Sequence, residues 1–424
     1  MTTNPNQAET QPGAASTPVD STDAKAAKAK RRATRATTMG AMFLMATSAI
    51  GPGFITQTSV FTVQLGAAFA FAILMSILVD IAIQLNVWRV LGVSGMRANE
   101  LGNAVVPGLG WVMGAFVFVG GLIFNIGNIG GAGLGTNAML GIDPIIGGAI
   151  SALVAALVFL SKWAGAALDR IVVILGALMI LLMIYVAIVS APPVGEALKQ
   201  TVLPDQIDFV IITTLIGGTV GGYITFSGAH RLIDSGLTGP EHAKDITRVS
   251  VTGILVTGVM RTLLFLAIFG VVASGVALSG DNIAADAFRA AAGEIGVRFF
   301  GIVLWAAGLT SVIGASFTSV TFVTTQKIAP RTRNLLTLAF ILVCTVAYVI
   351  LNQAPQKLLI FAGAFNGLIL PIGFGVVLWV AWRRRDLLKG YKYPVWLWSI
   401  GALTWLLTLW LGWRSLSGIA AMWA

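Results

Sequence analysis

The sequence predicts an all-α polytopic membrane protein, and two observations carry this prediction. Apolar residues make up 57% of the 424 residues and charged residues only 10%, whereas a soluble domain carries about 25% charged residues. Apolar stretches of about 20 residues, the length that crosses a bilayer, recur along the whole chain. A membrane β-barrel would instead show short segments of alternating hydropathy.

The chain divides into a polar amino-terminal segment and a long apolar region. Residues 1–38 are polar and end in a basic cluster, so we expect a disordered basic cytoplasmic tail. Residues 39–424 are expected to form one transmembrane domain. Its apolar stretches predict about eleven spanning helices, at residues 40–64, 66–91, 108–138, 143–161, 170–191, 207–236, 247–278, 297–326, 333–352, 357–382 and 394–416.

The distribution of positive charge predicts the orientation of these helices. Most of the 27 Lys and Arg residues fall in the tail and in loops on the same side as the tail. Positively charged loops face the cytoplasm. The protein is therefore expected in the cell (inner) membrane with its amino terminus in the cytoplasm. The same rule accounts for the net charge of +10 without a nucleic-acid partner.

Two of the predicted spans contain residues that disfavour a continuous helix. Gly51-Pro52-Gly53 lies midway along the first span, and Gly217-Gly218 and Gly221-Gly222 lie midway along the sixth. Paired interruptions at matching positions indicate inverted repeats with a binding site at the breaks. The predicted units are repeat one at about 40–191, repeat two at about 207–382 and an extra helix at about 394–416.

These motifs resemble the NRAMP family of divalent-metal transporters over nearly all of residues 40–416. Gln64-Leu65-Gly66 is similar to the family's Gln-Tyr-Gly, which places its metal-ligating Asp-Pro-Gly-Asn motif on residues 51–54. "IGGTVGGY" is similar to the family's Ala-Thr-Ile-Met-Pro-His and places the ligating Ala and Met on Gly218 and Gly221. "AAGLTSVIGASFTSVTFV" resembles the family's eighth span. The resemblance implies the APC/LeuT-type fold and transport by alternating access.

The chain departs from the family at the positions that the resemblance assigns to metal and proton. Gly51, Phe54 and Gly221 replace the ligating Asp, Asn and Met. Asn125 and Asn128 stand where the family's proton route carries Asp and Glu, and an amide takes up no proton at physiological pH. No direct ligation of metal by side chains is therefore expected.

Loss of the Asp makes the site less negative, and the glycines are expected to enlarge it. Half-helix amino termini favour anionic ligands. The leading expectation is therefore uptake of a divalent metal, Mn²⁺ above all, carried as a complex with a small carboxylate. The candidate lining residues are Gly51, Phe54, Thr56, Gln57, Thr58, Gly218, Gly221, Tyr223, Thr225 and Asn366.

Several further polar residues within the spans are candidates for coupling or gating. Asp80 and Arg261 are costly at membrane depth, and they either serve function or form a structural ion pair. His230 and Arg231 either belong to an inner gate or form a solvated helix end.

Two other functions stay open at this point. One is a carrier for a metal-free organic solute, such as a carboxylate, an amino acid or a nucleobase. The other is a transport-inactive sensor or channel on the same scaffold. An enzyme is not supported, because the sequence has no P-loop, no nucleophile–base pairing and no His/Cys cluster. No cofactor is expected, and beyond substrate and lipid bilayer we expect a monomer.

Overall fold

The computed structural model describes residues 51–424 except 279, 325–327 and 422–424. The predicted tail, residues 1–38, and the first half of the first span, residues 40–50, lie outside the described residues. Every regular element of the described chain is a helix. The elements are α2 (Pro52–Leu65), η1 (Gly66–Ala68), α3 (Phe69–Ser94), α4 (Ala98–Val105), α5 (Leu109–Leu140), α6 (Pro144–Leu160), α7 (Lys162–Ser190), α8 (Val194–Val202), α9 (Phe209–Thr219), α10 (Ile224–Asp234), η2 (Pro240–His242), α11 (Ala243–Ala273), α12 (Ile283–Val323), α13 (Pro330–Leu351), α14 (Pro355–Arg383) and α15 (Val395–Ala421).

The helices agree in outline with the predicted spans. Within the described chain, 8 helical segments are long and apolar enough to cross a membrane, or up to 9 if α7 and α8, bent by 105°, form one span. α2 and α3 together make one of these segments, and α6 is a shorter apolar helix. The predicted number of eleven spans therefore stays a prediction.

Three features of the helices differ from the sequence prediction. The short helices α4 and α8 were not expected, since an apolar-stretch search finds only long segments. α12 begins at Ile283 rather than at 297, and it bends at Gly293, whose backbone has φ 65°. The predicted sixth span is two helices, α9 and α10, separated at Val220–Tyr223.

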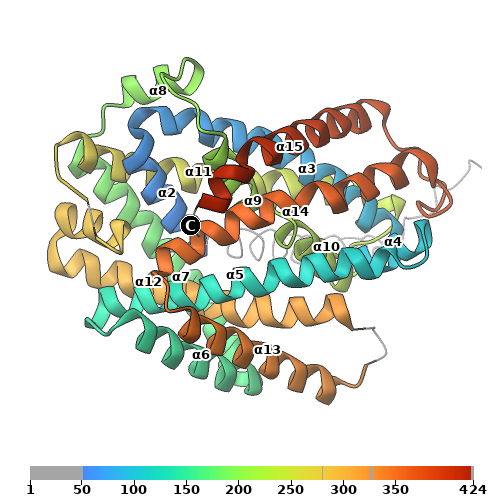
Figure 1. Ribbon diagram of the computed structural model, residues 1–424, viewed down its shortest axis with the longest axis horizontal. Helices are drawn as coiled ribbons and strands as arrows, with labels where there is room; N and C mark the ends of the chain where they lie inside the picture. The colour runs from blue at the N-terminus through green and yellow to red at the C-terminus, as the bar shows by residue number, and fades with distance from the viewer. Residues whose placement is uncertain (1–50, 279, 325–327, 422–424) are drawn as a thin grey trace, which may run out of the picture.

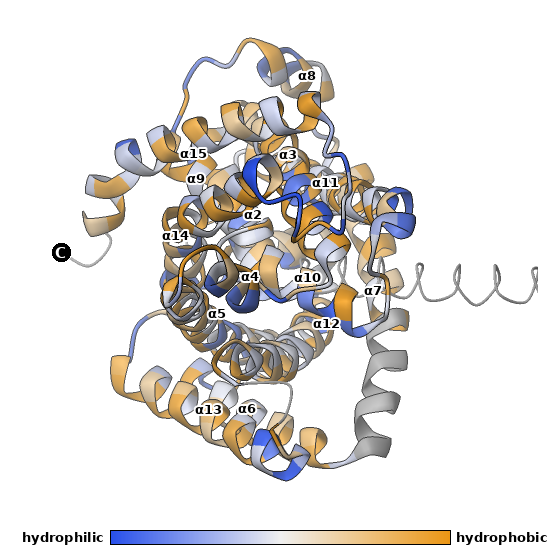
Figure 2. Ribbon diagram, turned by 90° about the vertical axis from the view of Figure 1, so that its right-hand side faces the viewer, coloured by the Kyte–Doolittle hydropathy of each residue, from blue (hydrophilic) through white to orange (hydrophobic). Residues whose placement is uncertain are grey.

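α2 lies at the centre of the helix bundle. It packs against α3, α5, α9, α11, α12 and α14, and every residue of Pro52–Thr62 is buried. Figure 1 shows α5, α12 and α14 running alongside one another along the long axis of the molecule. Figure 2 shows α6 and α13 at one edge of the bundle and α8 at the opposite edge. The broken regions of the chain are thus enclosed by longer helices.

Glycines bring α9 and α14 into close contact. A Cβ atom at Gly217 would lie 1.9 Å from the carbonyl oxygen of Gly363, and one at Gly367 would lie 2.5 Å from that of Thr213. Small residues spaced four apart allow this approach of two helices. The outer helices carry exposed apolar side chains instead, such as Leu153. Such a surface fits a lipid environment.

Candidate functional site

α2 begins at the interruption that the sequence predicts in the first span. Gly51 precedes the helix in an extended conformation, and its carbonyl oxygen accepts from the Ile55 amide at 3.3 Å. Pro52 occupies the first helical position, where a missing N–H costs no helical hydrogen bond. Its ring lies where a Cβ atom at Gly131 would stand, at 2.1 Å. The start of α2 can therefore pack closely against α5 because residue 131 is a glycine.

The second break is held by one residue of α14, Asn366. The Asn366 Oδ1 accepts from the Tyr223 amide at 3.0 Å, and the Asn366 carbonyl accepts from the Gly222 amide at 2.8 Å. These are amides that the interrupted helix cannot pair by itself. The Asn366 Nδ2 donates to Gly120 O at 3.2 Å and Ala362 O at 2.9 Å. Asn366, a predicted lining residue, thus holds the broken backbone in place.

The expectation that the span-six glycines enlarge a cavity is wrong for this structure. A Cβ atom at Gly218 would lie 2.3 Å from the Gln57 Oε1, so the Gln57 amide fills that space. A Cβ atom at Gly221 would lie 2.2 Å from Gly217 O and 2.7 Å from the Asn366 Cβ. Gly221 therefore requires glycine because a backbone carbonyl approaches closely, whereas at Gly218 only the end of the Gln57 side chain occupies the space.

Gln57 lies between two helices at the centre of the bundle. Its Nε2 donates to Leu359 O in α14 at 3.2 Å, and its Oε1 has no hydrogen-bond partner among the described residues. The side chain is 1% exposed. A buried amide oxygen without a partner is costly, so it is a position where a ligand or water can bind.

The other predicted lining residues are all buried. The Thr58 hydroxyl donates to Phe54 O at 2.7 Å within α2, and the Tyr223 hydroxyl donates to Ala315 O at 3.2 Å. The Thr225 hydroxyl has no hydrogen-bond partner within the described chain. Thr56 lies in α2 and its side chain is buried. Thr58 and Tyr223 therefore use their hydroxyl protons within the protein.

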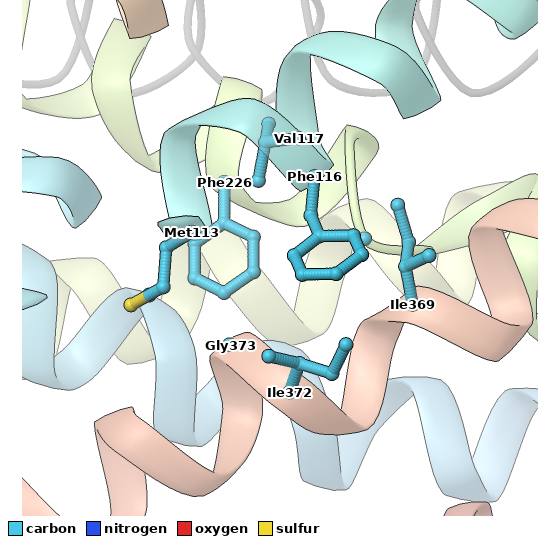
Figure 3. A pocket seen from close by; sticks show the side chains of 8 residues that line it. Met113, Phe116, Val117, Phe226, Ile369, Ile372 and Gly373 are labelled. Carbon is cyan, nitrogen blue, oxygen red and sulfur yellow. The ribbon is translucent and has the colours of Figure 1, made fainter. Parts of the chain in front are cut away.

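A small cavity lies beside the second break (Figure 3). Gly222 and apolar side chains such as Met113, Phe226 and Ile369 line it. Its volume of about 10 Å³ is room for about one water molecule. The cavity is too small and too apolar to be a carboxylate or metal site.

Arg261 connects the two breaks. Its guanidinium Cζ lies 4.6 Å from the centroid of the Phe54 ring in the first turn of α2. Its Nη1 donates to the hydroxyl of Thr219, the last residue of α9, at 3.1 Å. The side chain is 2% exposed, and its Nε and Nη2 have no hydrogen-bond partner among the described residues.

Asp80 lies near Arg261 without contacting it directly. The described ion pairs do not include these two side chains. Both side chains interact with Thr219, and they affect each other electrostatically. Asp80 is 1% exposed and its Oδ1 has no partner in the described chain. Of the two alternatives for Asp80 and Arg261, a direct structural ion pair is not formed among the described residues.

Asn125 and Asn128, which the resemblance places on the family's proton route, are fully buried in α5. The Asn125 Nδ2 donates to the Ser316 hydroxyl at 2.9 Å. Neither side-chain atom of Asn128 has a partner among the residues that the structure describes. These amides line the interior next to α12 but carry no titratable group.

His230 does not belong to a solvated helix end. It is 1% exposed, and its Nε2 accepts from the Ala98 amide at 3.2 Å. One turn further along α10, Asp234 forms an ion pair with Arg97 at 2.9 Å. These contacts connect α10 to α4. The sequence did not predict them, because it did not predict the short helix α4. Arg231 is half-buried.

No group of three or more His, Cys, Asp or Glu side chains that could hold a metal ion occurs in the described part of the chain. The oxygen atoms at the breaks belong to amides, hydroxyls and backbone carbonyls, apart from the carboxylate of Asp80. Transition metals prefer carboxylate, imidazole or sulfur ligands. The described site therefore supplies poor ligands for a bare transition metal.

The chain is similar to membrane proteins from two bacteria. It is 48% identical over 367 residues to YcsG of Bacillus subtilis (strain 168), described as an uncharacterized membrane protein, covering 86% of this chain and 90% of YcsG. It is 50% identical over 360 residues to an uncharacterized membrane protein of Haemophilus influenzae (strain ATCC 51907 / DSM 11121 / KW20 / Rd), covering 85% and 90%.

Two kinds of solved structure share the fold. A crystal structure of a variant of the Eremococcus coleocola manganese transporter superposes with a TM-score of 0.65 at 18% identity, covering 90% of this chain and 86% of that one. MhsT in complex with L-phenylalanine superposes with a TM-score of 0.63 at 20% identity, covering 88% and 98%. These likenesses confirm the predicted all-helical fold of the transporter type.

The described break between α9 and α10, the resemblance of residues 51–54 and 216–223, and the sequence comparison agree. A family model described as natural resistance-associated macrophage protein-like matches residues 42–417, which is most of the chain. The protein therefore belongs to the natural resistance-associated macrophage protein-like (Nramp) family.

Proposed function

We propose that the protein is a secondary transporter that carries a divalent metal, Mn²⁺ above all, as a complex with a small carboxylate. Movement is by alternating access at the two helix breaks, in the cell (inner) membrane, with the amino terminus in the cytoplasm. Membership of the Nramp family supports transport of a divalent metal and is consistent with a protein that is not an enzyme. The manganese transporter with the same fold supports Mn²⁺ as the metal.

One observation carries the carboxylate part of the proposal. A buried guanidinium, that of Arg261, lies against Phe54, which the resemblance places at a metal-ligand position. A positive charge at this depth repels a bare dication, and opposite charges attract in the poorly screened interior. A metal that arrives with its own carboxylate oxygens has shed most of its charge and does not need side-chain ligands.

A second candidate function is transport of a metal-free carboxylate. The arrangement of Arg261 attracts a free organic anion for the same electrostatic reason. MhsT, solved with L-phenylalanine, has the same fold, so this scaffold is compatible with an organic solute. The absence of a metal-ligand cluster in the described residues favours this candidate further.

A thermal-shift screen of the purified protein in detergent tests the proposal. A ligand at about 100 times its dissociation constant stabilises the folded state by about 2.7 kcal/mol. We expect Mn²⁺ alone to give little stabilisation and Mn²⁺ with citrate to give a large one. Equal stabilisation by citrate without metal would favour the metal-free candidate, and a full shift with Mn²⁺ alone would contradict the carboxylate complex.

A further inference from the structure

Arg261 is a buried cation, and only one of its three guanidinium nitrogens has a hydrogen-bond partner among the described residues. Its Nη1 donates to the Thr219 hydroxyl, while its Nε and Nη2 have no hydrogen-bond partner among the described residues. The side chain is 2% exposed. Unpaired donors on a buried charge are costly, because each has lost its water. A native structure retains such an arrangement most readily when a ligand supplies the missing acceptors.

The unpaired nitrogens are the pair that matches a carboxylate. Nε and Nη2 lie along the same edge of the planar guanidinium, and their N–H bonds are nearly parallel. A carboxylate can accept from both at once, which gives a bidentate, charge-assisted contact. Thr219 uses the nitrogen that does not belong to this edge.

The surroundings of Arg261 place it at the breaks rather than in a remote part of the core. Phe54, under the guanidinium at 4.6 Å, lies in the first turn of α2, where the helix dipole adds positive potential. Thr219 is the last residue of α9 before the second break. An anion held by Arg261 would thus lie next to both half-helices that alternating access must move.

Asp80 lies near Arg261 without occupying the Nε and Nη2 edge of its guanidinium. The two side chains act on each other electrostatically but form no ion pair in the structure, and the Asp80 Oδ1 is unpaired within the described chain. A direct bidentate ion pair would have joined the Asp80 carboxylate oxygens to the Nε and Nη2 of Arg261. Among the described residues, the Nε and Nη2 edge of Arg261 therefore has no acceptor.

We propose that Arg261 is the carboxylate anchor of the substrate site, gripping one carboxylate of a small anion through Nε and Nη2. The inference rests on the proposed transport function and names the group of the substrate that is recognised. That carboxylate belongs either to a free acid or to an acid that also chelates a metal.

Binding of matched acid and amide probes to the purified full-length protein tests this assignment. Malonate and malonamide are close in size, but only malonate carries carboxylates. Isothermal titration calorimetry should show that the wild type prefers malonate. Arg261→Gln should weaken malonate binding by about 10- to 100-fold, the range for losing hydrogen bonds to a charged group, and should leave malonamide binding unchanged.

Arg414→Gln is the matched control. Arg414 also lies over a phenylalanine ring, that of Phe209 at 5.4 Å, but its side chain is exposed. This variant should retain the preference for malonate. Repeating the titrations with Mn²⁺ present separates the two sources of the carboxylate, since a metal complex predicts tighter binding of the mixture than of either component.

Three results would overturn the assignment. The first is a wild type without preference for malonate, and the second is a folded Arg261→Gln protein with undiminished preference. The third is an equal loss of malonate affinity in Asp80→Asn, because the affinity would then not depend specifically on the Arg261 guanidinium. The anchor instead predicts that Asp80→Asn binds malonate as tightly or more tightly, since Asp80 supplies no donor to the carboxylate.

Arg261→Lys keeps the test decisive if Arg261→Gln does not fold. Lysine retains the positive charge but cannot form the bidentate contact. Its malonate affinity should fall between those of the wild type and a site without a cation, and full wild-type affinity would overturn the role of the guanidinium edge. Because these measurements require no transport, a failure of Mn²⁺ uptake would count against the proposed function alone.

Discussion

Asn366→Leu removes the side chain that holds the second helix break, and the structure sets the size of its effect. The buried Tyr223 amide would lose its acceptor, and an orphaned buried donor costs about 1–3 kcal/mol. The two bonds from Asn366 Nδ2 to the carbonyls of Gly120 and Ala362 would also be lost, at about 0.5–1.5 kcal/mol each. Leucine is close to asparagine in size, so these losses should not be masked by a large change in volume, and together they amount to about 2–6 kcal/mol.

Two measurements check this prediction. Unfolding by SDS in mixed micelles gives the loss of stability, and hydrogen–deuterium exchange of the peptide that covers the break should become faster. Asn137→Leu is the control, because Asn137 makes one bond, to Ile142 O at 3.0 Å, at a partly exposed helix end. If Asn366→Leu is no less stable than Asn137→Leu and exchanges no faster at the break, the side chain does not hold the break.

Three further predictions concern packing, the contact with α4 and coupling. Gly221→Ala should destabilise the protein by about 1–3 kcal/mol, because its new Cβ meets a backbone carbonyl at 2.2 Å. Gly176→Ala is the control and should not destabilise it, because no atom lies within 4 Å of the new Cβ. Equal melting temperatures of the two variants would refute this prediction. His230→Phe should lose about 1–3 kcal/mol because a buried amide loses its acceptor, while His242→Phe, at a partly exposed residue, should be nearly neutral in the same unfolding assay. Because amides stand at the family's proton-route positions, substrate uptake should not acidify the lumen of proteoliposomes, and a pH dye showing acidification matched to uptake would contradict this.

The fold was predictable because its main signals are local. Apolar stretches of spanning length and paired glycine motifs can be read without knowing what packs against them. The break at residues 220–223 follows directly from Gly221 and Gly222. The amphipathic helices α4 and α8 were not predictable in the same way, since neither is long or uniformly apolar.

The site was only partly predictable because its contacts are long-range. The sequence identified Asn366, Gln57 and Arg261 as candidates. It could not show that Asn366 pairs with an amide 143 positions away, or that Gln57 fills the space beside Gly218. A glycine can mean an open cavity or a close neighbour, and only the partner across the interface decides between them. Thr219 was missed because a threonine within an apolar span has no distinguishing pattern of its own.

Dual-label uptake into proteoliposomes tests the central claim most directly. The protein is reconstituted, and ⁵⁴Mn²⁺ and ¹⁴C-citrate are supplied separately and together. We predict weak manganese uptake from metal alone, a steep rise when citrate is added, and accumulation of the two labels in a fixed ratio. Manganese carried equally fast without any carboxylate would contradict the account, because the uncharged ligands at the breaks would then suffice for the bare ion.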